Sequence, residues 1–125
     1  MIRYFRCDKC GNLVESVHSS GVPMVCCGEK MRELVPGSVD AAVEKHVPVV
    51  SVEGSVVRVH VGSVTHPMTE EHLIEWITLE TNRGVQRKTL SASEAPEAVF
   101  ALAEGEQAVA AYAYCNLHGL WKADC

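Results

Sequence analysis

The uneven distribution of cysteines constrains the fold of this chain more than any other feature of its sequence. The six thiols stand at Cys7, Cys10, Cys26, Cys27, Cys115 and Cys125. The first four lie within a segment too short to bury enough apolar surface to fold alone, so this segment needs a crosslink. We therefore predict two units, residues 1–36 and residues 37–125, with the boundary at the Pro36-Gly37 turn signal.

The first four cysteines have the residue types and spacing of a metal site. Cys7 and Cys10 form a CxxC knuckle followed by Gly11, and an adjacent pair, Cys26-Cys27, replaces a second CxxC. Neighbouring side chains in a strand point to opposite faces, so the pair requires a kinked backbone to turn both sulfurs toward one ion. Thiolates bind both zinc and iron, and the spacing leaves that choice open. A disulfide between the adjacent cysteines is disfavoured because its ring is strained.

Composition and charge exclude several classes of function. The chain has a net charge of −5, which argues against nucleic acid or an acidic membrane surface as a partner. Hydrophobic residues make up 47% of the sequence, enough for a globular core. The sequence shows neither a signal peptide nor an apolar stretch long enough to cross a membrane. We expect a cytoplasmic protein, and in a reducing compartment clustered thiols bind metal more often than each other.

Beyond Pro36 the sequence alternates between apolar and polar residues with a period of two, which is typical of β-strands. Two turn signals, Glu53-Gly54 and Asn82-Arg83-Gly84, predict hairpins. The predicted strands are residues 47–52, 55–61, 72–81, 85–90 and 107–115. Residues 91–105 predict either a helical turn around 98–103 or a long connection. The fold class is therefore mostly β, with a small antiparallel sandwich.

Histidines and one cysteine of the second unit stand at the ends of predicted strands. Cys115-Asn116-Leu117-His118 places a thiolate close to an imidazole, His66 and His72 flank a proline turn, and His46 precedes the first strand. Taken singly, each histidine has an ordinary interpretation as a core or surface side chain. Together they offer five ligands, more than structural zinc needs, and leave a sixth position for iron chemistry.

For the remaining charged and histidine residues the sequence gives weaker evidence of a function. Neutral imidazoles leave an iron ion with net positive charge, which attracts a small anion, and Lys45 adds to that charge. Glu44 supplies a carboxylate that protects or refills the sixth position, although an ordinary exposed charged pair is the alternative for both residues. We expect His60, on one face with Arg58, and His18, in a Ser- and Gly-rich loop, to be solvated.

The assembled motifs resemble those of desulfoferrodoxins, the two-iron superoxide reductases, over essentially the whole chain. In addition to the four N-terminal cysteines, the resemblance rests on Glu44-Lys45-His46-Val47-Pro48, residues 62–68, residues 72–77 and residues 115–121. It implies a desulforedoxin-like module at 1–36, with iron bound by four thiolates. It also implies an immunoglobulin-like sandwich at 37–125 and a homodimer. The implied second iron has His46, His66, His72 and His118 in its equatorial plane and Cys115 as its axial ligand.

The resemblance further implies one-electron reduction of superoxide to hydrogen peroxide, with a rubredoxin-like protein as external electron donor. Lys45 would attract superoxide and help deliver protons, and Glu44 would bind the resting ferric ion. Two alternatives remain: a non-catalytic iron electron-transfer protein, and a zinc-stabilised scaffold whose histidines are incidental. The first iron is either an electron relay or a structural element.

Overall fold

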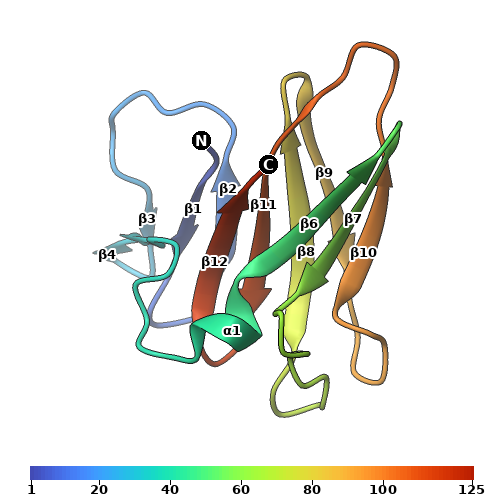
Figure 1. Cartoon of the computed structure of the whole chain (residues 1–125). Helices are drawn as coiled ribbons and strands as arrows, with labels where there is room; N and C mark the ends of the chain where they lie inside the picture. The colour runs from blue at the N-terminus through green and yellow to red at the C-terminus, as the bar shows by residue number, and fades with distance from the viewer. The chain divides into compact units, whose positions relative to one another are not determined.

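Two compact units, Met1–Val35 and Pro36–Cys125, make up the computed structural model, which describes all residues from 1 to 125 (Figure 1). Each is described by itself below. No helix in the chain has the length and apolar character needed to cross a membrane.

The first unit is made of short strands with little apolar packing. A three-stranded antiparallel sheet has the order β2-β1-β5, and β3 pairs with β4 in a small hairpin. The strands are β1 (Arg3–Arg6), β2 (Leu13–Ser16), β3 (Val25–Cys26), β4 (Glu29–Lys30) and β5 (Arg32–Glu33). Only Tyr4, Cys7 and Leu34 are buried in this unit. So small a core cannot offset the conformational entropy of the segment, which fits a requirement for a metal crosslink.

The second unit is a sandwich of two antiparallel sheets. One sheet has the order β10-β7-β6 and the other β12-β11-β8-β9. The strands are β6 (Pro48–Glu53), β7 (Val56–Val61), β8 (Ile74–Thr81), β9 (Gly84–Thr89), β10 (Glu97–Ala101), β11 (Ala108–Cys115) and β12 (Gly119–Asp124). The first, second and fifth strands of the unit share one sheet and the others form the second, which is an immunoglobulin-like arrangement. The predicted fold class, mostly β with an antiparallel sandwich, is confirmed.

The core lies between the two sheets and follows the period-two pattern of the sequence. Val57, Val59 and Val61 alternate inward along β7, and Ile77 and Leu79 face them from β8. Alternate residues of β11, including its last, Cys115, belong to the same buried cluster. The inward face of β11 therefore runs from the apolar core directly to a thiol at the end of the strand.

Three elements differ from the expectations. Residues 97–101 form strand β10, neither a helical turn nor a connection, because Ala98 and Phe100 point into the core while the backbone pairs with the edge of β7. His46 ends a single helical turn, α1 (Val43–His46), which precedes the first strand of the sandwich. Strand β12 pairs with β11 along its whole length and was not predicted.

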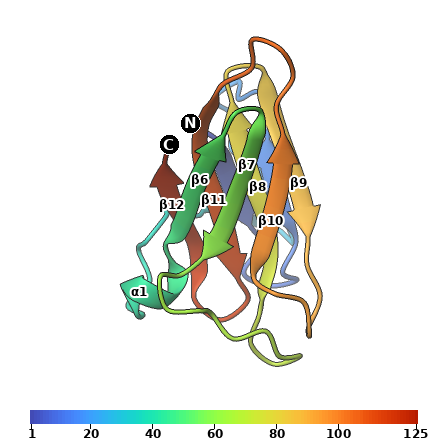
Figure 2. The same cartoon turned by 45° about the vertical axis from the view of Figure 1, so that its right-hand side comes forward.

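One end of the sandwich gathers the segments that carry the histidines. Both views place α1, the connection between β7 and β8, and the β11–β12 turn at this end (Figures 1 and 2). Antiparallel pairing causes this, since the last residue of β11 lies opposite the first residues of β8 and β12. Segments distant in the sequence therefore reach a common site.

Burial in the core makes Phe100 a test of the sandwich. Phe100 is 1% exposed, whereas Val52 on β6 is 54% exposed. We expect Phe100→Ala to lower the free energy of unfolding by about 3–5 kcal/mol, because it leaves a cavity. The matched variant Val52→Ala should cost no more than about 1 kcal/mol. Urea unfolding followed by the fluorescence of Trp76 and Trp121 measures both; equal losses would contradict this placement of the core.

Candidate metal centres

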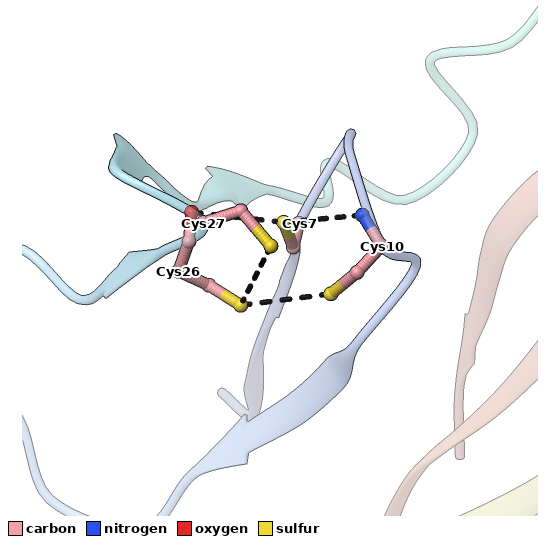
Figure 3. Close-up of side chains that lie close together, drawn as sticks. All are labelled: Cys7, Cys10, Cys26 and Cys27. Atoms are coloured by element: carbon pink, nitrogen blue, oxygen red, sulfur yellow. Dashed lines mark hydrogen bonds between the residues drawn. The ribbon is translucent and has the colours of Figure 1, made fainter.

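The four N-terminal thiols converge in the first unit. Cys7 and Cys10 lie on the loop after β1, and Cys26 and Cys27 lie at the β3–β4 turn facing it (Figure 3). The four sulfur atoms lie within 4.8 Å of one another, with 3.6 Å between the sulfurs of Cys10 and Cys26. Thiolates at about 2.3 Å from a tetrahedral ion are about 3.8 Å apart. The cluster therefore has the dimensions of a site for a single ion, and we name it the four-thiolate centre.

The backbone turns both sulfurs of the adjacent pair inward by leaving the extended conformation. Cys27 has φ of 52° and Gly28 has φ of 76°, so two consecutive residues adopt the left-handed conformation. This is the kink that the adjacent pair requires. All six cysteines are free, so the pair is not a disulfide. The amide groups of Cys10 and Asn12 point at the sulfurs of Cys7 and Cys10, each at 3.5 Å, and stabilise negative charge there.

The thiols of the four-thiolate centre do not ionise equally. The backbone N–H of Cys10 is the main cause that lowers the pKa of Cys7, to about 6. Hydrogen bonding with Cys10, Cys7 and Cys26, in that order of importance, keeps the proton on Cys27 and raises its pKa to about 12. Four thiolates this close repel one another, so a cation is needed to keep them all deprotonated. The donor set fits a resident iron ion.

Four imidazole rings form a near-square in the second unit. In the order His46, His66, His72 and His118, successive ring centroids are 4.7, 4.6, 5.1 and 4.8 Å apart around the square. The diagonal from His46 to His72 is 6.4 Å, and neighbouring rings are nearly perpendicular. Such a ring of donors matches the equatorial plane of a metal ion, and with Cys115 we name it the imidazole-thiolate centre.

Backbone carbonyls select which ring nitrogens face the centre. His46 donates from Nδ1 to the carbonyl of Ala42 at 2.7 Å, and His66 donates from Nδ1 to the carbonyl of Pro67 at 2.6 Å. Each bond leaves Nε2 as the free donor atom for a metal. The Nε2 atoms of His66 and His72 are buried without any hydrogen-bond partner. Orphaned buried nitrogen atoms are costly, and a bound ion is the partner that fits them.

Cys115 and His118 complete the donor set from the β11–β12 turn. The Nδ1 atom of His118 lies 3.1 Å from Nε2 of His46 and 3.8 Å from the sulfur of Cys115. Two nitrogens bound at right angles to one ion, each at about 2.1 Å, are about 3.0 Å apart. The donor atoms of His46, His66, His72 and Cys115 also lie within 4.8 Å of one another. The five side chains fit one iron ion.

Burial favours the neutral form of His46, His66 and His72, which is the form that binds metal. Desolvation lowers the pKa of His66 to about 4 and is also the main cause that lowers the pKa of His46 and His72. For Cys115, burial raises the pKa, and the backbone N–H groups of Leu117 and His118 partly oppose it. A cation in the centre favours the thiolate of Cys115 and compensates for its burial.

Glu44 and Lys45 lie on α1 beside His46, and both side chains are exposed. Neither side chain is among those whose donor atoms converge on the centre. Lys45 is nevertheless close enough for its positive charge to contribute, after burial, to the lowered pKa of both His46 and His72. The backbone carbonyl of Glu44 accepts hydrogen bonds from the amide of Val64 at 2.9 Å and the hydroxyl of Ser63 at 3.3 Å. These bonds hold α1 at the rim of the imidazole-thiolate centre.

Sequence reasoning missed several supporting groups. Trp121 stacks on the His46 ring at 4.9 Å and donates from Nε1 to the carbonyl of His118 at 3.0 Å. Its position just after the Cys115–His118 motif could have indicated a place near the centre, but only the fold shows that it covers the ring of His46. Of the two other histidines, His18 is exposed in the first unit. His60 is half-buried, not fully solvated, and its Nδ1 donates to the carbonyl of Gly62 at 3.0 Å.

Known families match both units. The desulfoferrodoxin family profile matches residues 38–124, and the profile of the desulfoferrodoxin N-terminal domain matches residues 2–34. The chain belongs to the desulfoferrodoxin family. The four-thiolate and imidazole-thiolate centres correspond to the two iron sites of a two-iron desulfoferrodoxin.

Relatives and solved structures extend the likeness along the whole desulfoferrodoxin chain. A desulfoferrodoxin from Nitratidesulfovibrio vulgaris is 47% identical over 120 residues, covering 96% of this chain and 94% of the relative. The superoxide reductase from Treponema pallidum has a crystal structure with a TM-score of 0.83 and 44% identity, covering 99% of both chains. A superoxide reductase of the 1Fe type from Giardia intestinalis covers 66% of this chain and 97% of its own, with a TM-score of 0.57 and 34% identity.

Gly62 allows α1 to approach the end of β7, and alanine there should disturb the imidazole-thiolate centre. A Cβ atom on Gly62 would overlap the carbonyl oxygen of Val64 and lie 2.8 Å from that of Lys45. Gly54 is a matched control, because its φ is also positive but a Cβ meets nothing within 4 Å. We expect Gly54→Ala to cost about 1–2 kcal/mol of unfolding free energy. Gly62→Ala should cost more and also lower the iron content of the imidazole-thiolate centre; equal effects in urea unfolding and iron assays would contradict this.

The four-thiolate centre should be separable from the imidazole-thiolate centre. Cys26→Ser removes one of four thiolates, and we expect loss of iron from the four-thiolate centre, with faster proteolysis of the first unit. The imidazole-thiolate centre should keep its iron and its absorption spectrum, since its donors all come from the second unit. Cys125→Ser is the control and should change neither centre. Loss of both spectra in Cys26→Ser would show that the centres depend on each other.

Proposed function

We propose that this protein is a superoxide reductase, which converts superoxide, one electron and two protons into hydrogen peroxide. The observation that carries the proposal is the imidazole-thiolate centre: a near-square of four imidazole rings with a buried cysteine side chain. An iron ion accepts six donors, so five protein ligands leave room for one small exogenous ligand. Iron bound there supplies the single electron and is reduced again by an external donor.

We propose the following ligand roles within the two centres. His46, His66 and His72 bind iron through Nε2 and His118 through Nδ1, with Cys115 as the thiolate ligand. Cys7, Cys10, Cys26 and Cys27 bind the other iron. Residues 1–36 form the desulforedoxin-like module, and residues 37–125 form the domain that carries the reaction. The first iron serves either as an electron relay or as the crosslink of its module.

Charge near the mouth of the imidazole-thiolate centre determines which substrate reaches it. The chain as a whole carries −5 and repels an anion such as superoxide. Lys45 provides a local exposed positive charge on α1, next to a ligand and close enough to influence two of the rings. We propose that Lys45 attracts the anion and supplies or orders the protons that peroxide formation consumes. Glu44, on the same helical turn, would offer its carboxylate as the further ligand of the iron in its resting state.

The partners and location also belong to this proposal. A rubredoxin-like protein supplies the electrons, and the chain works as a homodimer. It acts in the cytoplasm against oxidative stress. All six cysteines are free, which supports a reducing compartment.

One observation favours a second candidate function, that of a non-catalytic electron-transfer protein. The four-thiolate centre has a closed set of ligands, which suits an iron site that exchanges electrons without binding substrate. The two functions differ in their products, because only the reductase generates hydrogen peroxide from superoxide.

Stopped-flow mixing of the reduced protein with superoxide tests the proposed function directly. We expect oxidation of the iron in the imidazole-thiolate centre together with hydrogen peroxide, and no dioxygen beyond that from spontaneous dismutation. Iron that stays reduced, with no peroxide beyond that from spontaneous dismutation, would favour the electron-transfer protein. Zinc in place of iron in both centres would favour a scaffold and contradict both redox functions.

Removing the charge of Lys45 should slow the encounter with superoxide. We expect Lys45→Ala to lower the second-order rate constant by about tenfold at low salt and to flatten its dependence on ionic strength. The control is Lys30→Ala, which removes an equal charge from exposed strand β4 of the first unit. Pulse radiolysis measures both rates. An unchanged rate for Lys45→Ala would remove this residue from the mechanism.

A further inference from the structure

Asn116 connects the turn that carries Cys115 to the loop that carries His72. Its side-chain Nδ2 donates to the carbonyl of Glu71, and its Oδ1 accepts from the amide of Leu73, both at 3.0 Å. Its own backbone amide donates to the carbonyl of Leu73 at 3.2 Å. These three bonds hold the backbone on both sides of His72.

His72 depends on its backbone more than the rings of His46 and His66 do. The rings of His46 and His66 are oriented by backbone carbonyls at Nδ1, whereas Nδ1 of His118 faces Nε2 of His46 across the centre. The ring of His72 makes no hydrogen bond to the protein, and its Nε2 is buried. Its position therefore follows from the backbone of residues 71–73. Thr69 holds the backbone of His72 directly: its amide donates to the carbonyl of His72 at 2.9 Å, and the amide of His72 donates to the carbonyl of Thr69 at 3.2 Å.

The regular pairing between β8 and β11 breaks at this point. Tyr114 pairs with Trp76, but Cys115 pairs with Ile74, so Glu75 is an extra residue on β8. Such a bulge alters the direction of the strand end and leaves fewer ladder bonds to fix it. The side chain of Asn116 supplies two bonds just beyond the irregularity, where the ladder has ended.

We propose that Asn116 is a positioning residue of the imidazole-thiolate centre, whose amide sets the place of His72 relative to Cys115. The inference rests on the proposed function only in that His72 and Cys115 bind iron. Groups that orient metal ligands commonly affect metal affinity by about 10–100-fold. The amide of Asn116 acts in this way through the backbone of His72, without touching the ion.

The chain offers a matched control at Asn82, in the β8–β9 turn at the opposite end of β8. Its Oδ1 accepts from the amide of Gln107 at 2.8 Å, and its Nδ2 donates to the carbonyl of Gly105 at 3.4 Å. Asn82 thus joins two exposed loops through the same two amide contacts, but it lies at the other end of β8 from the imidazole-thiolate centre. Alanine at Asn82 removes equivalent bonds without affecting a ligand.

The experiment compares Asn116→Ala, Asn116→Asp and Asn82→Ala in the full-length iron-loaded protein. Iron release to bipyridine is followed at the absorption bands of the two centres, with the band of the four-thiolate centre as internal reference. We expect release from the imidazole-thiolate centre to be about tenfold faster or more in Asn116→Ala, with a shift of its thiolate-to-iron band. Asn82→Ala should match the wild type in both. Asn116→Asp keeps the oxygen that accepts from the amide of Leu73 but loses the N–H group that donates to the carbonyl of Glu71. We therefore expect its iron release to be slower than that of Asn116→Ala and faster than that of the wild type.

A second measurement does not depend on iron. In the iron-free protein, the amide of Leu73 should exchange its hydrogen faster in Asn116→Ala than in Asn82→Ala, because its acceptor is gone. Wild-type iron retention and band position in Asn116→Ala would overturn the inference and leave the proposed function standing. If the amide of Leu73 exchanges equally fast in Asn116→Ala and Asn82→Ala, the inference is also overturned and the proposed function is unaffected. A wild-type protein that takes up no iron at the imidazole-thiolate centre would overturn the proposed function and this inference together.

Discussion

The convergence of five donor side chains at one end of the sandwich is the constraint on which the imidazole-thiolate centre depends. They come from α1, the loop between β7 and β8, and the β11–β12 turn, which only the packing of the two sheets brings together. The buried valines of β7 and the inward face of β11 hold the sheets in register. Because Cys115 is both the last residue of that face and a donor, core packing also fixes the position of the thiolate.

The first unit relies on a different source of order. With three buried residues it has almost no apolar core, and its four thiols would repel one another if all were ionised without a cation. Metal binding and folding are therefore coupled in this unit, as in other small metal-stabilised modules. The second unit has a core of its own. Because of this difference, we expect that the four-thiolate centre can be lost without the imidazole-thiolate centre.

Much of the architecture follows from local patterns. Period-two alternation with Glu53-Gly54 and Asn82-Arg83-Gly84 as turns predicts four of the strands, because these signals act over a few residues. Residues 97–101 escaped prediction because their alanine and glutamate content favours a helix, and only the open edge of β7 makes them a strand. The short turn α1 was also missed, since it is stabilised by contacts of Glu44 with a loop distant in sequence.

By itself, the sequence determined the types of donor and their grouping: a CxxC with an adjacent pair, and imidazoles with a thiolate at strand ends. Ligand chemistry belongs to the side chains and is visible without a fold. Only the tertiary structure decided which ring nitrogens of His46 and His66 face the imidazole-thiolate centre, that Trp121 covers His46, and that Asn116 bonds to the backbone beside His72. The reason is that these positions depend on hydrogen bonds and packing between segments far apart in the chain, which no local pattern encodes.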